Sequence, residues 1–189
     1  MTNKKWMALL LIPMTVVMMC GCNCDPACLS ALITTVGQSV VQLGGIIGSD
    51  PSLSAADKQK MVDAQARAKT TVDTAASLIA AWKPGAPVTE IVNELDAAQT
   101  NLSEILSIAH VVNSSKVSLI ESGVNLALGA IQLVLSKVPT SPAAAPKLME
   151  RKTSVPVVIT KSTPTNAKEY KSQWNAIVDQ QGASEAKLK

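Results

Sequence analysis

The strongest constraint on the fold is a helical spacing of apolar residues that runs without a lapse from residue 88 to residue 112. The apolar positions alternate steps of three and four: Val88, Ile91, Leu95, Ala98, Leu102, Ile105, Ala109 and Val112. Such steps place side chains on one face of an α-helix, whereas a strand requires steps of two. Glu90 and Glu94 lie on the other face. We therefore predict an amphipathic helix with one buried side.

Three more segments between Asp25 and Val138 repeat this spacing, and local signals mark where two of them begin. The first segment follows Asp25, a good N-cap residue, and has Pro26 at its first helical position. The second follows Ser54, whose spacing to Asp57 resembles a capping box. Four consecutive helices are therefore predicted for this part of the chain.

The predicted architecture follows from the aromatic content and the short connections. Only 2% of the residues are aromatic and none is Phe, so the core has to consist mainly of Ala, Val, Leu and Ile. Connections of about five residues make consecutive helices antiparallel neighbours. The predicted fold is all-α, an up-down antiparallel four-helix bundle followed by a Pro-rich linker and a short C-terminal helix. The alternatives are a three-helix core with the first helix against lipid, and separate hairpins that oligomerise.

The first and fourth helices leave a contact with lipid open. Residues 28–48 contain no charged side chain, and residues 117–138 are apolar on almost every face. A helix of this kind lies at the centre of a bundle or in contact with a membrane. Polar residues such as Gln38, Gln42 and Glu121 interrupt the two helices. Because unpaired amides are costly in hydrocarbon, the bundle is favoured.

The N-terminus has the layout of a secretory signal. Lys4 and Lys5 precede an apolar run of 13 residues from Met7 to Met19, broken once by Pro13. A membrane-spanning helix needs about 20 apolar residues, and this run is shorter. A basic start, a short apolar run and small residues after it are typical of an export signal.

The end of this signal resembles the lipobox of bacterial lipoproteins. Met19, Cys20, Gly21 and Cys22 follow its order of one hydrophobic residue, two small residues and a cysteine, although Leu is commoner than Met19 and Cys20 is unusual. The resemblance implies cleavage before Cys22 and attachment of palmitate and other acyl chains to that residue, with Asn23 favouring the outer over the inner membrane. An uncleaved anchor, or ordinary cleavage with Cys22 left as a thiol, is the alternative.

The other cysteines favour a disulfide over a metal site. If Cys20 leaves with the signal and Cys22 is acylated, Cys24 and Cys28 remain and are candidates for a small disulfide loop in an oxidising envelope. Zinc sites usually combine more ligands at short spacing, and His110, the single histidine, lies more than 80 residues away. We predict no metal and no cofactor.

The composition changes after Val138, and the chain divides into four parts. These are a signal peptide at residues 1–21, the bundle at 22–138, a Pro-rich extended linker at 139–165, and a short helix with its tail at 166–189. The short helix carries one apolar stripe of Tyr170, Trp174, Ile177 and Val178. This stripe either docks on the bundle and seals a groove, or binds a partner through its aromatic anchors.

Charge separates the bundle from the tail. Residues 22–138 hold seven Lys/Arg against ten Asp/Glu, a net charge of −3, whereas residues 139–189 hold eight against four, a net charge of +4. The basic tail suits an anionic envelope polymer, lipid headgroups or the acidic bundle itself. Nucleic acid is not expected, because the lysines are dispersed without the aromatic interleaving of a single-strand binding surface.

No motif in the sequence indicates catalysis. It contains no nucleophile elbow, zinc-protease motif, P-loop or dinucleotide fingerprint. His110 is expected near the C-terminus of the third helix, where it would complement the helix dipole. The predicted function is therefore that of a non-enzymatic lipoprotein of the bacterial envelope with a structural or protein-interaction role. The alternative is a membrane-active protein of the kind that phages encode, which permeabilises the bilayer or excludes other phages.

Overall fold

All regular structure in the described part of the chain is helical. The computed structural model describes residues 25–83, 85–111, 116–138 and 163–189. Its elements are α1 (Pro26–Gly48), α2 (Ala55–Ala81), α3 (Thr89–Val111), α4 (Val117–Lys137), α5 (Ala167–Gln180) and a short 3-10 helix, η2 (Ser184–Ala186). The predicted all-α class is confirmed, and the helices begin and end close to the predicted residues.

The predicted start signals of the first two helices are also confirmed. The Asp25 side chain accepts a hydrogen bond of 2.8 Å from the backbone N–H of Cys28, and Pro26 is the first residue of α1. The Ser54 hydroxyl accepts from the N–H of Asp57 at 3.1 Å and donates to the Asp57 carboxylate at 2.7 Å. The bonds from the N–H groups of Cys28 and Asp57 satisfy backbone donors that have no acceptor within the helix.

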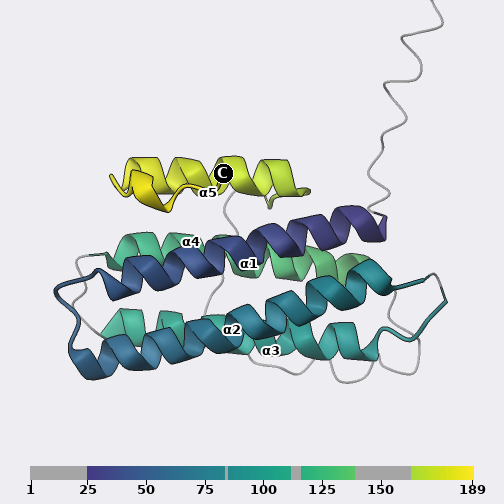
Figure 1. The fold of residues 1–189 in the computed structure, drawn as a ribbon, viewed down its shortest axis with the longest axis horizontal. Coiled ribbons are helices and arrows are strands. Elements are labelled where there is room, and N and C mark those ends of the chain that lie inside the picture. Colours follow the sequence, from purple (N-terminus) through teal and green to yellow (C-terminus); the bar gives the residue numbers. More distant parts are fainter. Residues whose placement is uncertain (1–24, 84, 112–115, 139–162) are drawn as a thin grey trace, which may run out of the picture.

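Helices α1 to α4 lie side by side along their length (Figure 1). Each contacts the next one in the chain, and α1 also contacts α4. Two side-chain bonds show that α1 and α2 run antiparallel, because Ser30 Oγ donates to the carbonyl of Ala76 at 3.0 Å and Gln65 Nε2 donates to the carbonyl of Val40 at 2.9 Å. This arrangement is compatible with a four-helix bundle.

The core is continuous through all five helices and mainly aliphatic, with Tyr170 and Trp174 of α5 as its aromatic members. It includes Leu32, Ile33 and Val36 of α1 and Ile120 and Val124 of α4, none of which exposes any side-chain surface to solvent. Helix α4 contacts α1, α3 and α5, which explains why it is apolar on nearly every face. Of the two environments predicted for this helix, the structure shows contact with neighbouring helices, and contact with a membrane stays a prediction.

Gln65 is a polar residue within this aliphatic core. Its side chain is 9% exposed and its amide donates to the carbonyl of Val40. A β-carbon at Gly44 would lie 2.9 Å from two atoms of the Gln65 side chain, so glycine leaves the space that this side chain occupies. The adjacent Gly45 has nothing within 4 Å of such a β-carbon.

The parts of the sequence outside the described residues include three predicted features. These are the signal peptide with Cys22, the cysteine Cys24, and residues 139–162 of the Pro-rich linker. They stay predictions from the sequence.

Two neighbouring glycines test the packing of α1 against α2. Gly45→Ala is expected to raise the free energy of unfolding by up to about 1 kcal/mol, because Ala loses less backbone entropy in a helix and the site is open. Gly44→Ala is expected to leave the protein about 0.5–1.5 kcal/mol less stable than Gly45→Ala, because the new methyl group shifts the end of the Gln65 side chain and weakens its hydrogen bond to Val40. Urea unfolding followed by circular dichroism measures both values. Equal stability of the two variants would contradict this packing.

Candidate functional site: the docking surface of α5

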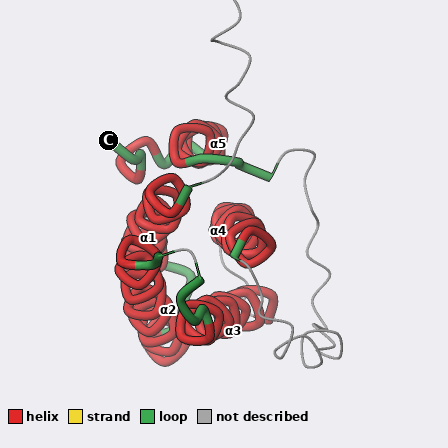
Figure 2. Tube along the Cα trace, turned by 90° about the vertical axis from the view of Figure 1, so that its right-hand side faces the viewer, coloured by secondary structure: helices red, strands yellow, loops and turns green. Residues whose placement is uncertain are grey.

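Helix α5 lies along one side of the α1/α4 pair, on the opposite side from α2 and α3 (Figures 1 and 2). It contacts α1, α4 and η2. We call the surface of α1 and α4 beneath α5 the α5 docking surface; its central residues are Ser39, Leu43 and Gly123.

Local capping begins α5 at the predicted position. The Asn166 side chain accepts from the N–H of Glu169 at 2.9 Å, and the Glu169 carboxylate accepts from the N–H and the hydroxyl of Thr165 at 2.8 and 2.7 Å. These hydrogen bonds stabilise the charged carboxylate and so lower the pKa of Glu169 below its usual range. The backbone bond from Thr165 contributes most, and the bond from its hydroxyl comes second. The helix start is therefore specified by residues 165–169 themselves.

The tightest contact of the site joins Trp174 to Gly123. Trp174 is fully buried. A β-carbon at Gly123 would lie 2.9 Å from Cζ3 of the Trp174 ring and 3.1 Å from Cδ2 of Leu43. Real β-carbons do not approach a rigid ring so closely, so only glycine fits at residue 123 while Trp174 stays in place.

The polar contact of the site joins Tyr170 to Ser39. Their hydroxyl oxygens are 2.6 Å apart and both residues are fully buried. Ser39 donates its hydroxyl proton to the carbonyl of Val36 at 2.8 Å, so the Tyr170 hydroxyl is the donor in the bond to Ser39. Burial raises the pKa of Tyr170 well above its usual value, because the tyrosinate would lose its hydration.

The C-terminal residues fold back along α5. Gly182, with a φ of 68°, reverses the chain after the helix. Trp174 Nε1 then donates to the carbonyl of Ala186 at 2.8 Å, and the Asn175 amide accepts from the N–H of Leu188 at 2.8 Å and donates to its carbonyl at 3.2 Å. Residues 163–189 therefore form one unit in which the tail is hydrogen-bonded to its own helix.

The predicted apolar stripe is the face by which α5 docks. Tyr170, Trp174 and Val178 are fully buried, and Ile177 is partly buried against the core. Of the two interpretations of this stripe, the structure shows docking on α1 and α4. Binding of a partner by the same four residues stays a prediction, and it would require their release from these contacts.

The remaining candidate residues are His110, in the last turn of α3, and Cys28, in the first turn of α1. His110 lies in the last turn of α3, as predicted, and its Nδ1 is 3.0 Å from the carboxylate of Glu121 on α4. Both side chains are partly exposed. No group of three or more His, Cys, Asp or Glu side chains in the described ranges is placed to hold a metal ion. Cys28 lies half-buried in the first turn of α1.

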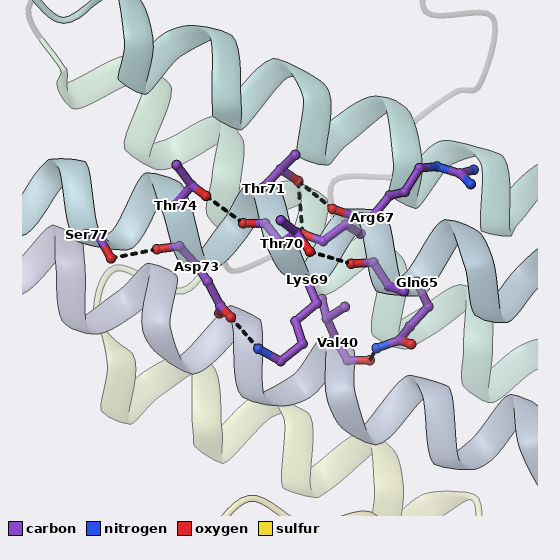
Figure 3. A network of polar contacts seen from close by, with 11 residues as sticks. Val40, Gln65, Arg67, Lys69, Thr70, Thr71, Asp73, Thr74 and Ser77 are labelled. Atoms are coloured by element: carbon purple, nitrogen blue, oxygen red, sulfur yellow. Dashed lines mark hydrogen bonds and ion pairs between the residues drawn. The ribbon is translucent and has the colours of Figure 1, made fainter.

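The hydroxyl groups on the outer face of α2 are occupied by their own helix. Thr70, Thr74 and Ser77 each donate to the backbone carbonyl four residues earlier, at 2.9 to 3.1 Å (Figure 3). The ammonium of Lys69 pairs with the carboxylate of Asp73 on the side of α2 towards α1, where a β-carbon at Gly37 would lie 3.0 Å from Oδ1 of Asp73. The bonds to the carbonyls satisfy the hydroxyl protons locally, so the outer face of α2 is a solvated helix surface.

Sequence reasoning found the α5 half of the site and missed the other half. Ser39 and Gly123 were not singled out, although each interrupts an apolar helix. A lone glycine within a helical pattern often has a packing reason. The pattern alone did not show which side chain occupies the space, because Trp174 is 51 residues away in the chain.

Comparison with protein-family models, with curated proteins and with solved structures finds no significant match to this chain. The functional interpretation therefore depends on its own residues and contacts.

The single tyrosine of the chain provides a direct test of the docked site. Because burial raises the pKa of Tyr170 only in the folded protein, its contribution to stability is complete below pH about 10 and is lost as the pH rises further. We expect tyrosinate absorbance to be absent from the native protein near pH 10, where the urea-unfolded chain titrates. Trp174→Ala, which loosens α5, is expected to move the native titration towards pH 10. Ordinary titration of the native wild type would show that Tyr170 is not buried.

Proposed function

We propose that the protein is a lipoprotein of the bacterial envelope that is tethered through Cys22 and acts by structural support or protein interaction, without catalysis. The observation that carries this proposal is the short apolar run ending in Gly21-Cys22, followed within three residues by Asp25. Asp25 is the N-cap of α1, so a folded helical domain begins almost at the acylated residue. Several acyl chains on one cysteine anchor a protein far more firmly than a single chain.

The architecture that we propose is the up-down antiparallel four-helix bundle. The bonds between α1 and α2 support it, as does the closing contact of α1 with α4. The contact of His110 Nδ1 with the Glu121 carboxylate, at 3.0 Å, joins the last turn of α3 to the first half of α4. A bundle of this kind is a rigid body that holds its surfaces at a constant distance from the tether.

The interaction role is supported by the charged outer surface and the basic tail. Arg67 of α2 pairs with Glu104 of α3 at 2.6 Å and donates to Asn101 at 3.3 Å, all at exposed positions. The net charge of +4 in residues 139–189 favours an anionic envelope polymer or an envelope protein as partner. We place the protein on the periplasmic or exterior side, at the outer membrane in preference to the inner one.

Intact mass spectrometry of the chain purified from a bacterial envelope tests the tether. The expected species begins at Cys22, carries the mass of its acyl chains, and is two hydrogens lighter than its dithiol form if Cys24 and Cys28 are joined. Cys22→Ser is expected to lose the added mass and the firm membrane attachment, whereas the matched Cys28→Ser variant keeps both. An unmodified full-length chain, or release of the wild type by buffer alone, would overturn the tether.

A second candidate function is that of a phage-type membrane-active protein, which permeabilises the bilayer or excludes other phages. The specific observation in its favour is that α1 and α4 are long and apolar enough to cross a membrane, with half of each apolar window buried in the structure. Buried core helices pass the same test, so we rank this function second.

Vesicle leakage separates the two functions. As a tethered interaction protein, the wild type is expected to leave dye inside vesicles of phosphatidylethanolamine and phosphatidylglycerol, because α1 and α4 stay packed against their neighbours. Fluorescence dequenching measures the release, and the Cys22→Ser variant controls for the acyl chains. Release that rises with protein concentration and persists in Cys22→Ser would move the membrane-active function to first place.

A further inference from the structure

We propose that α5 and its tail form a removable cover over a lipid-binding face made by α1 and α4. This proposal rests on the membrane location given under the proposed function. It adds that the position of α5 controls whether α1 and α4 contact lipid. When α5 is docked, the face is closed. When α5 leaves, the α5 docking surface contacts the bilayer.

The first observation is that α5 covers the two most apolar of the long helices. Among the described helices, α1 and α4 are the two that are long and apolar enough to cross a membrane. They are also the two long helices that α5 contacts, whereas α2 and α3 have no such contact with it. The cover therefore lies on the two helices for which exposure to water is most unfavourable, because they are apolar over a long stretch.

The second observation is the absence of charge beneath the cover. Residues 26–48, which form α1, contain no Asp, Glu, Lys or Arg. In α4, the charged residues are Glu121 near the start and Lys137 at the end. A surface without charges avoids the main penalty for contact with hydrocarbon.

The third observation concerns Ser39, the polar residue at the centre of this surface. Its hydroxyl donates to the carbonyl of Val36 in its own helix at 2.8 Å. That bond remains when Tyr170 withdraws, so uncovering the face leaves no serine proton without an acceptor. Serine bonded back to its own helix is a form in which hydroxyl groups are tolerated in membranes.

The cover is constructed to leave as one piece. The bonds of Trp174 to Ala186 and of Asn175 to Leu188 lie within residues 163–189, so they need not break on release. The bond of Tyr170 to Ser39 and the fit of Trp174 against Gly123 join α5 to the core. An isolated helix of 14 residues is marginal in water, and the bonds of α5 to the tail are expected to hold residues 163–189 together after release.

The tether indicates lipid as the occupant of the uncovered face. Only two residues separate Cys22 from Asp25, the N-cap of α1. With acyl chains on Cys22, the start of α1 lies within about 10 Å of the lipid surface, since an extended residue spans about 3.3–3.6 Å. The chargeless helix α1 is thus the helix nearest to the bilayer.

Two glycines of α4 provide the matched variants for a test. Gly123→Val places methyl groups where the Trp174 ring lies and is expected to release α5. Gly129→Val makes the same change about 1.7 turns further along α4, where a β-carbon would meet only Thr163, at 4.0 Å. Trp174→Ala weakens docking from the α5 side and leaves α1 and α4 unchanged, so it covers the case in which Gly123→Val fails to fold.

The experiment mixes each full mature chain, purified from the envelope, with vesicles of phosphatidylethanolamine and phosphatidylglycerol. A photoactivatable diazirine probe that partitions into the bilayer then labels side chains in contact with lipid, and mass spectrometry maps the labels. We expect Gly123→Val and Trp174→Ala to gain labels in α1 and α4. Wild type and Gly129→Val are expected to lack them.

Two results would overturn the cover. Equal labelling of α1 and α4 in all four proteins means that α5 does not control the face. Dimers of Gly123→Val without lipid labelling mean that a second copy, and not a bilayer, takes the place of α5. Flotation of the unlabelled wild type with the vesicles tests the tether separately. If only Gly123→Val and Trp174→Ala float and are labelled, the cover is supported and the tether has failed.

Discussion

Helix α4 has apolar side chains on nearly every face, and the rest of the structure is arranged to keep them from water. A neighbour on one side does not suffice for such a helix, because each exposed apolar side chain loses about 1.5–3 kcal/mol of stabilisation. Helices α1 and α3 cover two sides of α4, and α5 covers a third. Helix α5 thus buries apolar side chains of α4 that α1 and α3 leave uncovered.

The contacts of α5 differ in kind from those of the core. The pairs α1/α2 and α2/α3 are joined along long helices by interdigitated small aliphatic residues. Helix α5 is attached by a few large side chains, chiefly Trp174 and Tyr170, that enter positions suited to them at Gly123 and Ser39. Because a few side chains make these contacts, they fix the position of α5 on α1 and α4. Few contacts also have to break for α5 to separate from the bundle, which is the physical basis for regarding it as a cover.

Much of the secondary structure could be predicted because its causes are local. The steps of three and four in residues 88–112 reflect the turn of the helix itself, and Asp25, Ser54 and Asn166 cap the first turns that directly follow them. For the site, the stripe of Tyr170 and Trp174 was visible as one apolar face. The positions that contact this stripe, Ser39 and Gly123, could not be recognised in the sequence. A serine or glycine in an apolar helix has the same local pattern whether it meets solvent, a helix or an aromatic ring.

The sequence by itself determined the helices, the caps of α1 and α2, the mainly aliphatic character of the core and the apolar face of the last helix. These properties depend on residues within about one turn of each other. Only the tertiary structure decided that Trp174 lies against Gly123, that Tyr170 donates to Ser39, and that α5 lies on α1 and α4 in preference to α2 and α3. Such contacts join residues far apart in the chain, and shape and hydrogen-bond geometry select them once the helices are packed.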